Sequence, residues 1–88
     1  MSEELWKKVL EDLNPTTSQF KVLLYLAFRG PCQPSDISDY TEIPPGTVRP
    51  ALRTLLDKGY IEQKEDGEYK SLIPFTEIVS HLYMLAQM

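Results

Sequence analysis

Hydrophobic residues recur three and four positions apart in four segments of the chain, a spacing that aligns them along one side of an α-helix. The predicted helices cover residues 1–13, 16–29, 45–58 and 75–88. The second helix is apolar on almost every side, which is typical of the central helix of a small domain. Thr16 and Gln19 at its start have the spacing of a capping box.

A fifth, shorter helix is predicted between the second helix and the helix over 45–58. It is expected to follow Pro34 directly, with Ser35 as its N-cap. Ile37 and Tyr40 are expected to face the core. A tight turn then leads into the next helix, so that the two form a helix-turn-helix.

The helix over 45–58 has one apolar side and one polar side at about 100° per residue. The side expected to face the core carries Val48, Ala51, Leu52, Leu55 and Leu56. The opposite side carries Gly46, Arg49, Pro50, Arg53, Thr54 and Asp57. Lys58 lies in the last turn and Gly59 is the expected C-cap.

Pro50 lies inside this helix, where a proline costs about 3 kcal/mol. If Thr47 is the N-cap, Pro50 is the third helical residue, and its missing N–H is one that needs no partner. If the helix begins at Pro45, the Gly46 carbonyl loses its partner. We favour the second arrangement, with a distorted first turn from Pro45 to Arg49 and with Pro50 on the exposed side.

The pattern changes to strand-like segments after residue 59. Residues 60–64 and 68–73 are predicted strands, and Asp66–Gly67 between them is a strong hairpin signal. The predicted fold is therefore mainly α with a small β-hairpin wing, a winged helix-turn-helix with extra N- and C-terminal helices. We expect one domain over residues 1–88, with its core in 16–73.

The stretch TVRPALRTLLDKGYI at 47–61 resembles the passage from recognition helix to wing in regulators of the MarR and TrmB type. The helix-ending Gly30–Pro31, the DIS at 36–38 and the proline at 44 or 45 also resemble the TrmB-type domain, which is common in archaea. The resemblance covers about residues 9–88. It implies a DNA-binding transcription regulator. No segment resembles that family's sensor domain, so no effector site is carried over.

In a winged helix, exposed residues of the recognition helix contact base edges in the major groove. Arginine suits guanine or a phosphate, Thr47 suits a phosphate or a thymine methyl, and Gly46 permits close backbone approach. The expected contacts to double-stranded DNA are Gly46, Thr47, Arg49, Pro50 and Arg53, with Lys64 and Lys70 on the phosphate backbone. In the alternative interpretation, Arg53 pairs with Asp57 on a solvated face.

The charge balance argues against unselective DNA binding, because the formal net charge is -4. Basic residues outnumber acidic residues in the segment 44–58, whereas four acidic residues outnumber two lysines in the segment 59–73. A monomer should therefore bind DNA weakly, and the acidic wing tip should stay out of a minor groove. The low charge favours the alternative function, a winged-helix module that binds protein in transcription, replication or plasmid partition.

The two terminal helices carry more apolar surface than one small core requires, which predicts a homodimer. The expected interface residues are Trp6, Val9, Leu13, Ile78, Leu82, Tyr83 and Leu85. In the alternative arrangement, the first helix packs against the last within one chain.

Other features argue against further chemistry. No apolar run reaches the roughly 20 residues of a membrane span. The single cysteine, Cys32, is expected to be buried in the protein. A chain with one cysteine fits a reducing, cytoplasmic location. His81 has no cysteine or aspartate ligand nearby in the sequence, so we expect a solvent or interface histidine. We expect no enzyme activity, metal or cofactor, since no nucleophile–base pair or phosphate loop stands out.

Overall fold

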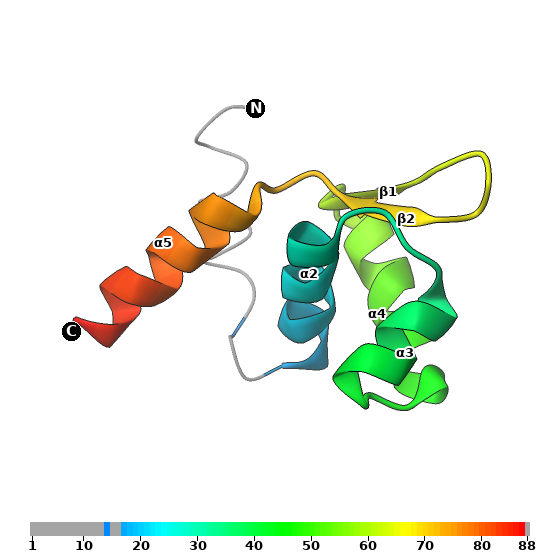
Figure 1. Cartoon of the computed structure of the whole chain (residues 1–88), viewed down its shortest axis with the longest axis horizontal. Coiled ribbons are helices and arrows are strands. Elements are labelled where there is room, and N and C mark those ends of the chain that lie inside the picture. The colour runs from blue at the N-terminus through cyan, green and yellow to red at the C-terminus, as the bar shows by residue number, and fades with distance from the viewer. Residues whose placement is uncertain (1–13, 15–16, 88) are drawn as a thin grey trace.

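The computed structural model describes residue 14 and residues 17–87 of the 88-residue chain (Figure 1). The helix predicted over 1–13 lies outside the described residues. The elements are α2 (Ser18–Arg29), α3 (Pro34–Thr41), α4 (Pro45–Asp57), β1 (Ile61–Gln63), β2 (Tyr69–Ser71) and α5 (Phe75–Ala86). This order of helices followed by a two-stranded hairpin confirms the predicted winged helix-turn-helix.

Helix α2 begins at Ser18, two residues after the predicted start at residue 16. Thr17, rather than Thr16, is the N-cap, and its Oγ1 accepts a hydrogen bond of 3.2 Å from the Phe20 N–H. At the other end, Gly30 has φ 90° and its N–H donates to the Leu26 carbonyl at 2.9 Å. A positive φ is strained for residues with a side chain, which explains why the helix ends at a glycine.

Helix α3 is capped by Gln33, not by Ser35. The Gln33 N–H donates to the Asp36 carboxylate at 3.1 Å, and Pro34 occupies the first helical position. Proline suits this position because its missing N–H would have no helical partner. Ile37 is buried as predicted, but Tyr40 is 69% exposed. The inward prediction for Tyr40 was wrong, because its ring stacks on the edge of the core against Tyr25, with centroids 4.8 Å apart.

Helix α4 begins at Pro45, with Pro44 as its N-cap. Pro50 is therefore the sixth helical residue, and the Gly46 carbonyl lacks its usual partner. The segment is α-helical from Pro45 to Asp57, and the N–H groups of Thr47 and Val48 both donate to the Pro44 carbonyl, at 2.8 and 3.0 Å. At the C-terminal end, Gly59 has φ 80°. The N–H groups of residues 59 and 60 donate to the carbonyls of residues 56 and 55, which is a Schellman motif.

The hairpin is antiparallel, with Gln63 opposite Tyr69 and Glu62 opposite Lys70. Its strands are shorter than predicted. The backbone of Tyr69 also exchanges two hydrogen bonds with Cys32, of 3.2 and 2.9 Å. This bridge, which the sequence did not predict, joins the hairpin to the segment between α2 and α3.

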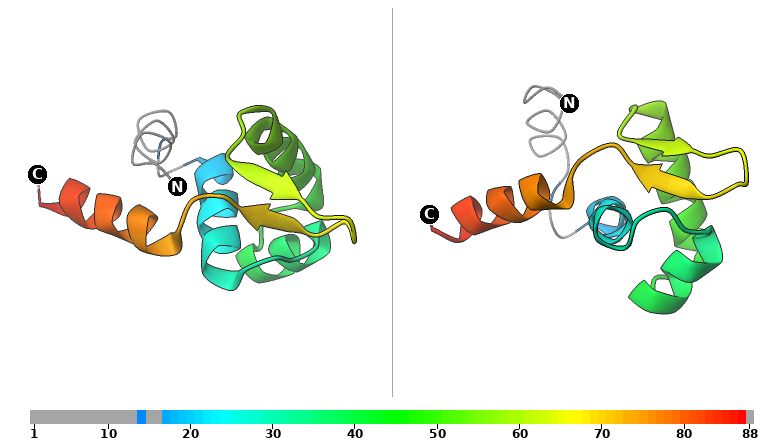
Figure 2. Two further views of the ribbon diagram at one scale, coloured as in Figure 1. Left: turned by 90° about the horizontal axis from the view of Figure 1, so that it is seen from above. Right: turned by 45° about the horizontal axis from the view of Figure 1, so that its top comes forward.

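The core lies among α2, α3, α4 and the base of the hairpin (Figure 1). Buried residues from nearly every side of α2 confirm that it is the central helix. Helix α5 extends away from this core in both further views (Figure 2). Of its described side chains only Ile78 is fully buried, and Leu82 packs partly against the core.

Candidate nucleic-acid interface

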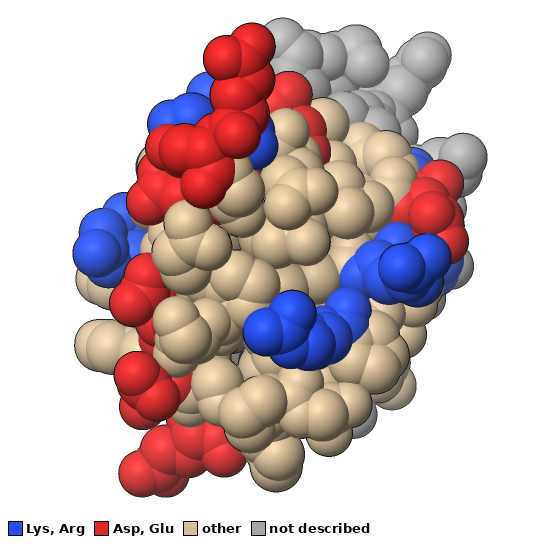
Figure 3. Space-filling model, turned by 90° about the vertical axis from the view of Figure 1, so that its right-hand side faces the viewer, with Lys and Arg blue, Asp and Glu red and all other residues tan. Residues whose placement is uncertain are grey.

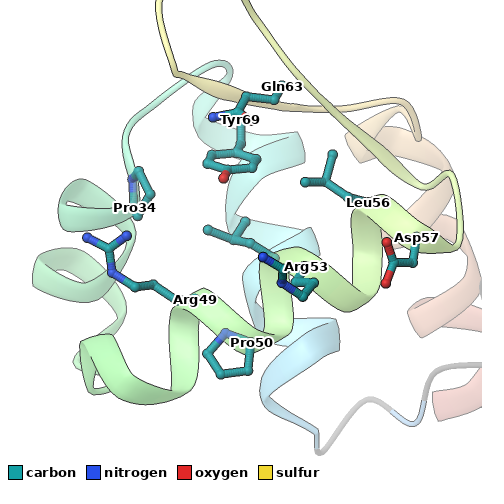
Figure 4. Close-up of a pocket in the computed structure, with 9 residues that line it drawn as sticks. Pro34, Arg49, Pro50, Arg53, Leu56, Asp57, Gln63 and Tyr69 are labelled. Atoms are coloured by element: carbon teal, nitrogen blue, oxygen red, sulfur yellow. The ribbon is translucent and has the colours of Figure 1, made fainter.

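Helix α4 presents its two arginines to solvent, as its periodicity predicts. Val48, Ala51, Leu52 and Leu55 are buried on the opposite side, whereas Arg49, Pro50 and Arg53 are exposed. No ion pair joins Arg53 to Asp57, so the predicted alternative of a paired arginine is not observed. The two guanidinium groups project from the same part of α4, one helical turn apart (Figure 4).

The first turn of α4 offers few backbone donors. Pro44 and Pro45 have no N–H, and the Thr47 N–H donates to the Pro44 carbonyl at 2.8 Å. The Gly46 N–H is the remaining donor of this turn, and Gly46 is exposed with nothing within 4 Å of an added Cβ. The expected attraction of this helix end for phosphate is therefore limited to one amide.

A hollow of about 520 Å³ lies between α4 and the hairpin (Figure 4). Arg49 and Arg53 line one wall, and Gln63 and Tyr69 line the opposite wall. Neither Gln63 nor Tyr69 was among the residues predicted for this site. The alternation of the strands was the available signal, because it puts Gln63 on the same hairpin face as the buried Ile61.

Lys64 and Lys70 lie apart from this hollow. Lys70 is opposite Glu62 in the register, so strand alternation puts both on the face of the hairpin turned away from α4. The Lys64 Nζ lies 3.8 Å from the carboxylate of the half-buried Glu68. The structure therefore does not bring the two lysines together with the arginines.

The face formed by α3, α4 and the hairpin carries little positive charge (Figure 3). Uncharged surface covers much of this face, Lys and Arg groups lie close to its middle and at both sides, and Asp and Glu groups lie mainly along one edge and at the top. At the hairpin tip, the Glu68 N–H donates to the Asp66 carboxylate at 2.9 Å, and this bond lowers the pKa of Asp66. The tip therefore stays negatively charged at neutral pH, in agreement with the expected acidic wing.

The predicted dimer residues separate into three groups. Trp6, Val9 and Leu13 lie outside the described residues, and the side chain of Leu85 is not described. Ile78 is fully buried in the core of its own chain, so its assignment to an interface is corrected. Leu82 is partly buried, whereas Tyr83 is 66% exposed.

The structure adds few other candidate sites. Cys32 is buried, as predicted, and burial raises the pKa of its thiol. Among residues 14 and 17–87, no group of three or more acidic, histidine or cysteine side chains could hold a metal ion. None of the helices within this part of the chain has the length and apolar character needed to cross a membrane.

Comparison with known protein families supports the winged helix-turn-helix interpretation. The profile of the MarR family matches residues 11–69 of the 88, which include α2, α3, α4 and β1. No match is found among curated proteins. The match confirms the MarR resemblance of the stretch at 47–61, while the finer resemblance to the TrmB type stays a prediction. Because the match covers well over half of the sequence, the chain belongs to the MarR family.

Proposed function

We propose that this protein binds double-stranded DNA as a homodimer and regulates transcription in the cytoplasm, with α4 in the major groove. The single observation that carries the proposal is the exposed pair of arginines on α4, without a carboxylate partner among the described residues. MarR-family proteins are regulatory DNA-binding proteins and generally act as dimers. An arginine on a base edge contributes about 1–3 kcal/mol of discrimination.

The dimer is supported by apolar surface on α5. Phe75, Val79 and Tyr83 follow one another at intervals of four residues, which places them along one side of the helix. Val79 is 42% exposed and Tyr83 is 66% exposed. The Phe75 ring lies beside the exposed Phe28 ring of α2, with the two ring centroids 5.3 Å apart. A two-fold pairing of this surface would bury it and present two α4 helices to one duplex. Two linked weak sites bind much more tightly than one.

The proposal is tested with mixed genomic fragments titrated at several salt concentrations. We expect the Arg49→Ala/Arg53→Ala variant to bind at least tenfold more weakly, and each lost phosphate contact to reduce the salt slope by about 0.9. Lys70→Ala is the matched control, because it removes a positive charge from the outer face of the hairpin. Affinity that is independent of salt, or unchanged by the double substitution, would exclude the DNA interpretation.

A second candidate function is binding of a protein partner through the same face. The broad uncharged surface of this face and its acidic border favour that function (Figure 3). Protein interfaces have cores depleted of charge, whereas DNA interfaces are strongly positive. The same titration separates the two functions, because a protein-binding module would show no measurable affinity for the fragments.

A further inference from the structure

The hairpin presents two neutral hydrogen-bonding side chains to α4. Gln63 and Tyr69 are directly opposite each other in the antiparallel pair, so they share one face of the hairpin. Ile61 is on this face too and is buried, which shows that the face is turned to α4. The hydroxyl end of the Tyr69 ring is directed toward α4, across from Arg49 and Arg53 (Figure 4).

The Tyr69 hydroxyl is available to a ligand. It makes no hydrogen bond within the described part of the chain, and the residue is only partly buried. Gln63 is exposed, and its Nε2 makes a single long contact of 3.4 Å with the Gly67 carbonyl. Both side chains can therefore turn a donor into the hollow without breaking a strong bond.

The wall that carries these side chains is held in place by the segment before α3. Two backbone hydrogen bonds join Tyr69 to Cys32, and the Gln33 amide donates to the Asp66 carbonyl at 3.4 Å. The hairpin is thus attached on both sides of its second strand, by β1 and by Cys32. A wall fixed in this way loses little conformational entropy when a ligand binds.

The chemistry of the hollow matches a sugar–phosphate strand. Pro34 and Leu56 supply apolar surface, while guanidinium groups stand on one wall and a hydroxyl and an amide on the other. Deoxyribose is largely apolar along its edge, and phosphate oxygens accept hydrogen bonds from all of these donor types. The single carboxylate in the lining belongs to Asp57, and Figure 4 shows it at the end of α4 away from Arg49.

We propose that the hollow between α4 and the hairpin receives one sugar–phosphate strand of the duplex, with Tyr69 and Gln63 donating to phosphate oxygens opposite Arg49 and Arg53. This inference rests on the proposed DNA binding. It assigns the wing contact to the base of the hairpin instead of its tip. The tip carries Glu65 and Asp66, whose charges repel phosphate.

The first test uses two substitutions on the hairpin wall in the full chain. Tyr69→Phe removes only the hydroxyl, and we expect about tenfold weaker binding of mixed duplex fragments, because one bond to a charged oxygen is lost. The salt slope should not change, since a neutral donor releases no counterion. Gln63→Glu puts a carboxylate on the same wall and should weaken binding further. Thermal melting followed by circular dichroism checks that both variants fold.

The second test uses the carboxylate of the hollow. Asp57→Asn removes a charge that repels the strand, and we expect several-fold tighter binding and a steeper salt slope. Glu62→Gln is the matched control, because it neutralises a carboxylate on the outer face of the hairpin. A gain for Asp57→Asn no larger than the gain for Glu62→Gln would place the strand elsewhere.

The outcomes separate this inference from the proposed function. If Tyr69→Phe and Gln63→Glu bind like the parent chain while Arg49→Ala/Arg53→Ala does not bind, the strand does not occupy the hollow, and the proposed function stands. If the parent chain itself does not bind the fragments, the proposed function and the inference both fail. Weaker binding by both hairpin variants with an unchanged melting temperature supports the inference.

Discussion

Helices α4 and α5 have 13 and 12 residues, yet they leave opposite kinds of surface exposed. Helix α4 buries four apolar side chains within its own chain and presents polar and basic groups to solvent. Helix α5 fully buries Ile78 but leaves Val79, Tyr83 and Met84 exposed. The surface that remains on each helix indicates its expected partner, a nucleic acid for α4 and a second apolar surface for α5.

The largest expected effect is on the free energy of unfolding, and it distinguishes the buried packing of α4 from the exposed side of α5. Leu55→Ala in α4 should lower the free energy of unfolding by about 3–4 kcal/mol, because it creates a cavity at a fully buried position. Val79→Ala in α5 should change it by less than about 0.5 kcal/mol. Urea unfolding at low protein concentration, where association contributes least, measures both. An equal cost for the two variants would show that α5 is packed within its own chain, and would remove the contrast.

The second prediction concerns proline at the sixth position of each helix, where it is removed from α4 and introduced into α5. Pro50 is the sixth residue of α4 and Ser80 is the sixth residue of α5. Ser80→Pro should cost about 3 kcal/mol, because it removes a helical hydrogen bond. Pro50→Ala should stabilise the fold by about 1–2 kcal/mol, because the Gly46 carbonyl regains its partner. The greater freedom of the unfolded chain offsets part of this gain.

Thermal unfolding of both variants gives these values. A Pro50→Ala variant less stable than the parent would mean that the first turn of α4 depends on the proline ring. We expect the stabilised variant to bind DNA no more tightly, because the substitution also removes an apolar group beside the arginines.

The smallest expected effect concerns association through α5. Tyr83→Lys places a charge on the exposed apolar side and should weaken dimerisation by at least tenfold, since large aromatic side chains dominate such interfaces. Ser35→Lys is the control, because Ser35 is exposed but lies on α3. Light scattering over a range of concentrations follows the shift toward the 10.1 kDa monomer. A parent chain that is monomeric at high concentration would refute the dimer.

The sequence by itself determined the helical segments of the described chain, to within a few residues, and the core side of α4. Hydrophobic periodicity identified the core side of α4, because a helix repeats every 3.6 residues and each side chain direction follows from its position. Asp66–Gly67 identified the hairpin turn, where Gly67 has φ 91°. These features depend on neighbours in sequence, so the pattern alone carries them.

Tertiary structure decided which apolar side chains are buried and which groups meet. The Cys32–Tyr69 bridge joins residues far apart in the sequence through backbone atoms, and no residue pattern encodes such a pair. Ile78 is buried and Tyr83 is exposed, although both belong to the apolar part of α5. The hollow between α4 and the hairpin likewise exists only after these elements pack, because Gln63 and Tyr69 face Arg49 and Arg53 from a different element.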